Sequence, residues 1–169
     1  MTRVDTKTIL YMVAKEFDLA RNTTEDRLKL QKTIYLLQAN GLQLGYGFSW
    51  YKYGPYSQDL VYDAHTVLKA ERNEYEAIAG PLKFNETSEK RFKEFKEICK
   101  DILGSTQDLE LAASVDFVQR TWYPDADEND IPDRIRMHKE KLFGDTTPIT
   151  NDKILKAFRI CRKLRAKRN

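Results

Sequence analysis

The sequence has few cysteines, with only Cys99 and Cys161 among its 169 residues. Two thiols are too few for a disulfide framework or a structural zinc site, so neither is expected. No apolar run approaches the roughly 18 residues that cross a bilayer. Lysines and acids interrupt the apolar positions of residues 1–17, which excludes a signal peptide. We therefore expect a reduced, cytoplasmic protein with no membrane partner.

Motifs for catalysis and cofactor binding are also missing. The sequence contains neither GxxxxGK followed by Ser or Thr nor GxGxxG, the glycine-rich loops that cradle phosphates. His65 and His138 have no partner at i+3 or i+4 that would form a metal-binding pair, and both cysteines fall on apolar helix faces. The clustered carboxylates lie in a predicted loop without an apolar wall to raise a pKa. We expect no enzyme activity, no metal, no cofactor and no small-molecule substrate.

The composition that is present fits one folded domain over residues 1–169. The AVILMFWYC set makes up 41% of the chain and charged residues make up 33%. This balance supplies both a core and a solvated surface, and the length lies in the range of about 100–200 residues that a single core serves.

The charges are unevenly distributed along the chain. Residues 153–169 carry eight Lys and Arg and no acid, which leaves 21 basic and 26 acidic residues, a net charge of −5, in residues 1–152. The densest acidic stretch is residues 124–133, with five carboxylates. A basic tail of this kind contacts nucleic acid or an acidic partner, folds back onto its own acidic loop, or stays solvated.

Apolar periodicity predicts a mainly α fold, a single compact domain of six or seven helices. Residues 42–53 combine glycines, aromatics and short alternation, which indicates a small antiparallel β element after the second helix, ended by Gly54-Pro55. Residues 73–86 have no clear period and allow short strands. The expected helices cover residues 6–17, 24–40, 57–68, 85–103, 107–121, 132–142 and 151–169. The expected N-caps are Asp5 or Thr6, Thr23 or Thr24, Asn85 or Thr87, and Thr150 or Asn151.

The last predicted helix, over residues 151–169, has two distinct faces. At 100° per residue its apolar residues share one arc, which is expected to dock on the body of the protein. The opposite arc is basic and is expected to be exposed, where it contacts nucleic acid or an acidic partner or is simply solvated. The apolar arc holds Ile154, Ala157, Phe158, Ile160, Cys161 and Leu164. The basic arc holds Lys156, Arg159, Arg162 and Lys163.

Residues 48–57 carry five aromatics beside a Gly-Pro turn. An extended strand there points Phe48 and Trp50 to one face and Tyr51 and Tyr53 to the other. Tyr and Trp are common in binding hot spots because they bury much area at small entropic cost. One face is expected to pack on the core and the other to present a platform to a partner. The alternative is that all these rings line a seam between the second and third helices.

Three segments then follow one another in a recognisable order. Residues 27–38 (RLKLQKTIYLLQ) contain the helix pattern KLQK followed by Tyr-Leu, residues 48–57 (FSWYKYGPYS) end an aromatic strand with Gly-Pro, and residues 60–63 (LVYD) belong to the next helix. This ordered set resembles the Panacea antitoxin domain family, which includes SocA-type antitoxins and the related YwgA-like proteins.

The resemblance covers a motif core over residues 27–68. Weaker agreement continues in residues 139–143 and in the basic helix at 154–164. Tyr56 follows Pro55 where many members have a smaller apolar residue, which favours the YwgA-like branch.

The resemblance implies a mostly helical domain with a small antiparallel β element. It also implies a cofactor-free protein that neutralises a toxin by direct binding, in a bacterial or phage conflict system such as phage defence. The predicted contact residues are Lys32, Trp50, Tyr51, Tyr53, Pro55 and Tyr56.

Two other classes of function remain open at this stage. A winged-helix-like DNA-binding regulator would explain the order helix, turn, helix and β element. In that case the second helix would carry Arg27, Lys29 and Lys32, and the basic tail would follow the phosphates. An enzyme of unfamiliar type, such as a nuclease partner subunit, is the third class, and the sequence offers no residues for its site.

Overall fold

A computed structural model describes residues 4–69, 73–144 and 147–168. The described part of the chain holds eight α-helices and one two-stranded antiparallel sheet in a single compact domain, so the predicted mainly α class with a small β element after the second helix is confirmed. The helices are α1 (Thr6–Glu16), α2 (Thr24–Ala39), α3 (Gln58–Lys69), α4 (Asn73–Ala79), α5 (Glu86–Ile98), α6 (Thr106–Trp122), α7 (Ile131–His138) and α8 (Asn151–Arg168). The strands are β1 (Ser49–Tyr51) and β2 (Gly54–Tyr56).

Side-chain caps begin several of these helices where the sequence predicts them. Asp5 accepts a hydrogen bond from the Thr8 amide at 2.8 Å, and Asn85 accepts one from the Ser88 amide at 2.8 Å. Thr23 caps α2 through the Asp26 amide at 3.0 Å. Each bond satisfies a backbone donor that the first helical turn leaves without a partner.

The helix count differs from the prediction by the short helix α4. This helix occupies part of residues 73–86, where short strands were allowed. Among residues 74–79 of α4, Ala79 alone is buried, while Ile78 is exposed and Tyr75 packs its ring 6.0 Å from that of Tyr11. A seven-residue helix that docks through so few side chains has no apolar period to detect.

The hairpin also differs from the prediction, because Gly54-Pro55 forms its second strand and does not end it. Trp50 pairs with Pro55, and Tyr51 pairs with Gly54. Proline is tolerated because a two-stranded sheet has only edge strands. Gly54 has a φ of +95°, and a Cβ atom there would collide with the Ser114 hydroxyl on α6. This position therefore requires glycine.

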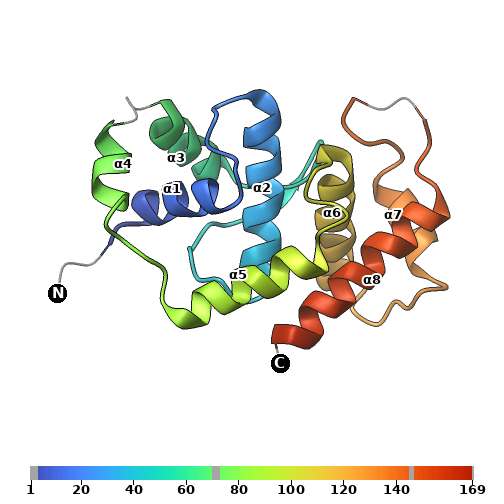
Figure 1. The fold of residues 1–169 in the computed structure, drawn as a ribbon. Helices are drawn as coiled ribbons and strands as arrows, with labels where there is room; N and C mark the ends of the chain where they lie inside the picture. Colours follow the sequence, from blue (N-terminus) through green and yellow to red (C-terminus); the bar gives the residue numbers. More distant parts are fainter. Residues whose placement is uncertain (1–3, 70–72, 145–146, 169) are drawn as a thin grey trace.

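The core is organised around α2 and α6, which lie side by side in the centre of the molecule (Figure 1). In the same view α1, α3 and α4 lie to one side of this pair, and α7 and α8 lie to the other. Every residue of α2 from Lys29 to Leu37 is buried. This central position matters for function because α2 carries the polar residues that hold the hairpin.

Buried charges on α6 fix the C-terminal half of the fold. Glu110 forms a fully buried ion pair with Lys139 at 2.6 Å. Asp116, also fully buried, accepts a hydrogen bond from Tyr35 at 2.7 Å and pairs with Arg120 at 2.7 Å and Arg165 at 3.2 Å. These contacts join α6 to α2, to α8 and to the segment after α7. Lys139 has extended backbone angles, so α7 ends at His138 and not at the predicted Leu142.

Candidate functional site

Two glutamines of α2 hold the segment that connects α2 to α3. Gln38 donates to the carbonyl of Tyr46 at 2.8 Å and accepts from the Tyr46 amide at 3.0 Å. Gln31, two helical turns earlier, makes the same pair of bonds to the carbonyl and amide of Ser57, at 2.9 and 3.1 Å. We call these contacts the glutamine clasps. They fix both ends of the hairpin region through backbone atoms.

Lys32 holds the hairpin itself from beneath. Its ammonium donates to the carbonyls of Tyr53 at 2.7 Å and Pro55 at 2.9 Å, and the residue is 1% exposed. Burial lowers the pKa of Lys32 to about 8, an effect that the charge of Glu110 opposes and that of Lys139 reinforces. Sequence reasoning placed Lys32 on a contact surface, but the structure places it inside, where it positions the backbone of the predicted site.

The two faces of the hairpin have different surroundings. Trp50 packs against Phe117 of α6 at 5.7 Å and against Trp122 at 5.8 Å, measured between ring centroids. On the other face, Tyr51 and Tyr56 contact each other at 5.2 Å, and Tyr51 is 60% exposed. The predicted alternation is therefore present, with one face packed on the body of the protein and the other open.

The predicted contact residues consequently fall into three groups. Lys32 and Pro55 are buried, Trp50 and Tyr53 are partly buried, and Tyr51 is exposed. Tyr56 is partly buried beside Tyr51. Tyr53 also packs its ring 4.9 Å from that of Phe143, a residue that sequence reasoning did not connect with the hairpin.

The open face of the hairpin borders a pocket of about 240 Å³ between α2 and α3, which we call the tyrosine pocket. Its rim carries Tyr51, Tyr53 and Tyr56. Leu28 of α2 and Val61 of α3 stand among the apolar residues of its walls. Concave, mainly apolar sites with a few polar groups are the usual form of binding sites.

His65 of α3 also lines the tyrosine pocket, and its Nδ1 atom is buried without a hydrogen-bond partner in the described part of the chain. Desolvation and the charges of Lys69 and Arg27 lower the pKa of His65. The sequence presents His65 only as an isolated histidine, because the pocket forms between residues distant along the chain.

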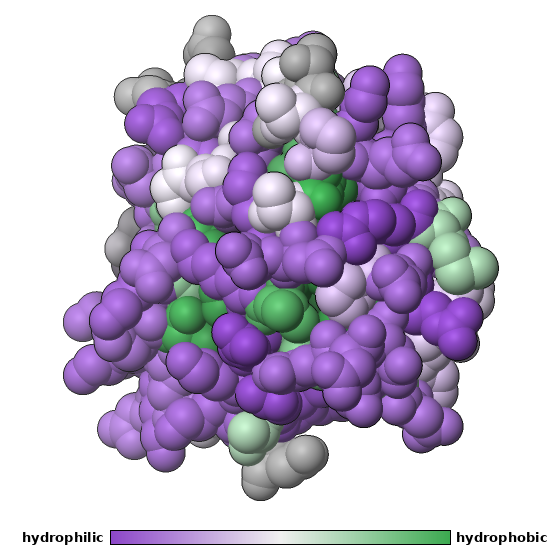
Figure 2. Space-filling view, turned by 90° about the vertical axis from the view of Figure 1, so that its right-hand side faces the viewer, coloured by the Kyte–Doolittle hydropathy of each residue, from purple (hydrophilic) through white to green (hydrophobic). Residues whose placement is uncertain are grey.

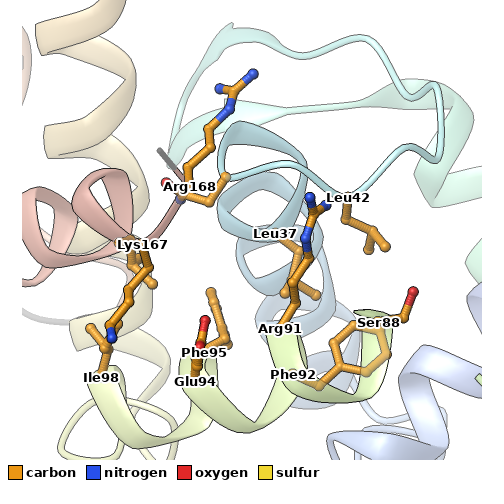
Figure 3. Close-up of a pocket in the computed structure, with 12 residues that line it drawn as sticks. Leu37, Leu42, Ser88, Arg91, Phe92, Glu94, Phe95, Ile98, Lys167 and Arg168 are labelled. Carbon is orange, nitrogen blue, oxygen red and sulfur yellow. The ribbon is translucent and has the colours of Figure 1, made fainter. Parts of the chain in front are cut away.

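Other hollows in the described structure fit the role less well. Figure 3 shows a notch lined by residues of α2, α5 and α8, among them Leu37, Phe92, Phe95 and Arg168. Its volume of about 40 Å³ is close to that of one water molecule, about 30 Å³. Two wider hollows, of about 400 and 510 Å³, lie against α1. The first holds charged side chains of both signs, among them Lys15, with no aromatic hairpin at its rim.

The arcs of α8 are arranged as the sequence predicts. The apolar arc is buried, and Lys156, Arg159, Arg162 and Lys163 are all exposed. Figure 2 shows the face formed by α7 and α8 as largely hydrophilic, with the most hydrophobic residues in recesses, while Met137 of α7 is 67% exposed. Two of the four basic residues reach back to the acidic loop, because Glu128 pairs with Arg159 at 3.1 Å and with Arg162 at 3.3 Å.

Metal-ligating side chains are not grouped in the described residues, and both cysteines are buried. Within residues 4–69, 73–144 and 147–168, no three His, Cys, Asp or Glu side chains are grouped closely enough to hold a metal ion. Burial raises the pKa of the Cys99 thiol to about 12, and Cys161 is also buried, with its pKa raised by desolvation. None of the helices in these ranges is long and apolar enough to span a bilayer.

No family model, curated protein or solved structure matches this chain.

Proposed function

We propose that this protein is a non-enzymatic, cytoplasmic binding module of antitoxin type, which neutralises a toxin protein by direct contact at the tyrosine pocket. The observation that carries the proposal is an exposed tyrosine edge on a rigidly held hairpin. Tyr51 and Tyr56 lie side by side beside an apolar pocket, while Lys32 and Gln31 fix the backbone beneath them.

This arrangement suits protein binding for two physical reasons. Tyrosine rings bury a large area with few rotatable bonds, so they are favoured in binding hot spots. A hairpin that is already ordered loses little conformational entropy when it binds. The toxin as partner, and the setting in a bacterial or phage conflict system, come from the resemblance of residues 27–68 to Panacea antitoxins.

The DNA-binding alternative receives less support from these contacts. Lys32 is buried, and Lys29 donates to the Gly104 carbonyl at 3.3 Å and pairs with Glu25 at 3.1 Å. Arg27 donates to the Asn22 carbonyl at 2.7 Å. A recognition helix needs an exposed face that enters the major groove, and the buried centre of α2 does not offer one.

The test is co-expression with the product of the adjacent reading frame. That product alone is expected to arrest growth, and the wild-type chain is expected to restore growth and to co-purify with it. The Tyr51→Ala, Tyr56→Ala double variant is expected to lose both effects while keeping the wild-type circular dichroism spectrum. Tyr62→Ala is the matched control, since Tyr62 is 65% exposed on α3 and does not line the pocket. A harmless neighbouring product that does not bind the chain would contradict the proposal.

A further inference from the structure

The volume of the tyrosine pocket matches a single large side chain. An apolar cavity of about 150 Å³ holds benzene, and sites for drug-sized ligands begin at about 300 Å³. The tyrosine pocket, at about 240 Å³, lies between these values. It therefore has room for one aromatic side chain of a partner protein with some margin, and little room for a larger free ligand.

The rim of the pocket favours an aromatic occupant over an aliphatic one. Tyr51, Tyr53 and Tyr56 all line it. Aromatic rings in edge-to-face or offset contact gain energy beyond the area that they bury. An entering ring can make such contacts with more than one tyrosine of the rim.

The charged and titratable groups of the pocket indicate which residues of the partner would lie beside that ring. Apart from its tyrosines, the titratable side chains among the described residues that line it are Arg27, Lys32 and His65, and no Asp or Glu is among them. A carboxylate on the partner supplies the charge opposite to that of Arg27.

We propose that the tyrosine pocket receives an aromatic side chain of the toxin that is flanked by an acidic residue, with the ring between α2 and α3 and the carboxylate toward Arg27. This inference rests on the proposed function and assigns the chemistry of the partner segment at the same site.

The first test uses blocked pentapeptides and the full chain labelled with ¹⁵N. Gly-Asp-Phe-Asp-Gly is expected to shift the amide signals of Tyr51, Ala64 and His65 in a saturable way. Replacing Phe by Ala is expected to weaken binding at least about tenfold, since burying a Phe side chain accounts for that much. Replacing both Asp by Asn is expected to weaken it about threefold or more at low salt, with a smaller effect at high salt. Equal binding of the Phe and Ala peptides, or of the Asp and Asn peptides, would overturn the proposal.

The second test fills the pocket from either wall. Val61→Trp on α3 and Leu28→Trp on α2 place a ring where the ligand ring would lie, and both positions are only partly buried. Each folded variant is expected to bind the Phe peptide at least about tenfold more weakly, and Tyr62→Ala is expected to bind it as wild type does. Two variants are used so that misfolding of one leaves the test intact.

The two proposals fail in different ways. If the toxin binds Val61→Trp as tightly as wild type but does not bind Tyr51→Ala, the aromatic occupant is wrong and the proposed function stands. If no toxin binds the wild-type chain at all, the proposed function is wrong.

Discussion

The glutamine clasp at Ser57 leads to a quantitative prediction. Gln31→Met removes both bonds to Ser57 but keeps the length of the side chain, so no large cavity is expected. Ser57 is 1% exposed, so its amide is left without a partner and without water, while its carbonyl keeps the bond from the Val61 amide at 3.2 Å. A buried group without a partner costs about 1–3 kcal/mol. The variant is therefore expected to lose about 1–3 kcal/mol of unfolding free energy.

The matched control is Gln38→Met, which removes the equivalent clasp at Tyr46. Gln38 is only partly buried, so water can replace part of its bonding. Its loss is expected to be about 1 kcal/mol, the usual net value of a hydrogen bond in water. Urea denaturation of both variants measures the difference.

Hydrogen exchange supplies a local measurement of the same effect. The Ser57 amide donates to Gln31 at 3.1 Å, so Gln31→Met is expected to speed its exchange, while the amides in the middle of α6 change only with global stability. The reasoning is refuted if Gln31→Met costs no more than Gln38→Met, or if the Ser57 amide keeps its protection.

Four further predictions test the interior and the surface. Lys32 has a pKa of about 8 in the folded protein, against an ordinary value of 10.5. Between these pH values the unfolded chain binds a proton that the folded chain has lost, so the free energy of unfolding rises with pH. The stability of wild type relative to Lys32→Met is therefore expected to rise by about 3 kcal/mol from pH 8 to 10.5, as measured by urea unfolding. Lys139→Met leaves Glu110 buried without its counter-charge and is expected to cost about 3–5 kcal/mol, and adding Glu110→Leu is expected to recover much of that loss in the same assay. Phe158→Ala empties a buried site on α8 and is expected to cost about 3–5 kcal/mol in chemical denaturation. Arg159→Glu reverses an exposed charge and is expected to leave the thermal unfolding midpoint unchanged, because exposed ion pairs contribute little.

Local signals predicted the parts of the fold that depend on neighbouring residues. Caps such as Thr23 and Asn85 act within one helical turn, so the sequence identifies them directly. The two arcs of α8 follow from its periodicity, because this helix has one face on the core and one in solvent.

The candidate site was only partly predictable, because its key contacts join distant segments. Lys32 is a predicted contact residue, and lysine is almost never fully buried. Its burial depends on two carbonyls more than 20 positions away, which no local pattern encodes. The aromatic residues 48–57 were recognised from composition, whereas the pocket beside them requires α3 to pack against α2, and His65 joins it only then.

Residues of α2 hold the hairpin region through its main chain. Gln31, Gln38 and Lys32 bond to backbone amides and carbonyls of this region. These backbone groups stay the same whichever side chains the region carries. The tyrosines at positions 51 and 56 can therefore be exchanged with little loss of scaffold order. Such a design separates the evolution of recognition from that of stability, so duplicated genes could diverge toward new partners by changing only the rim. A combinatorial library randomised at these two positions would exploit the same freedom.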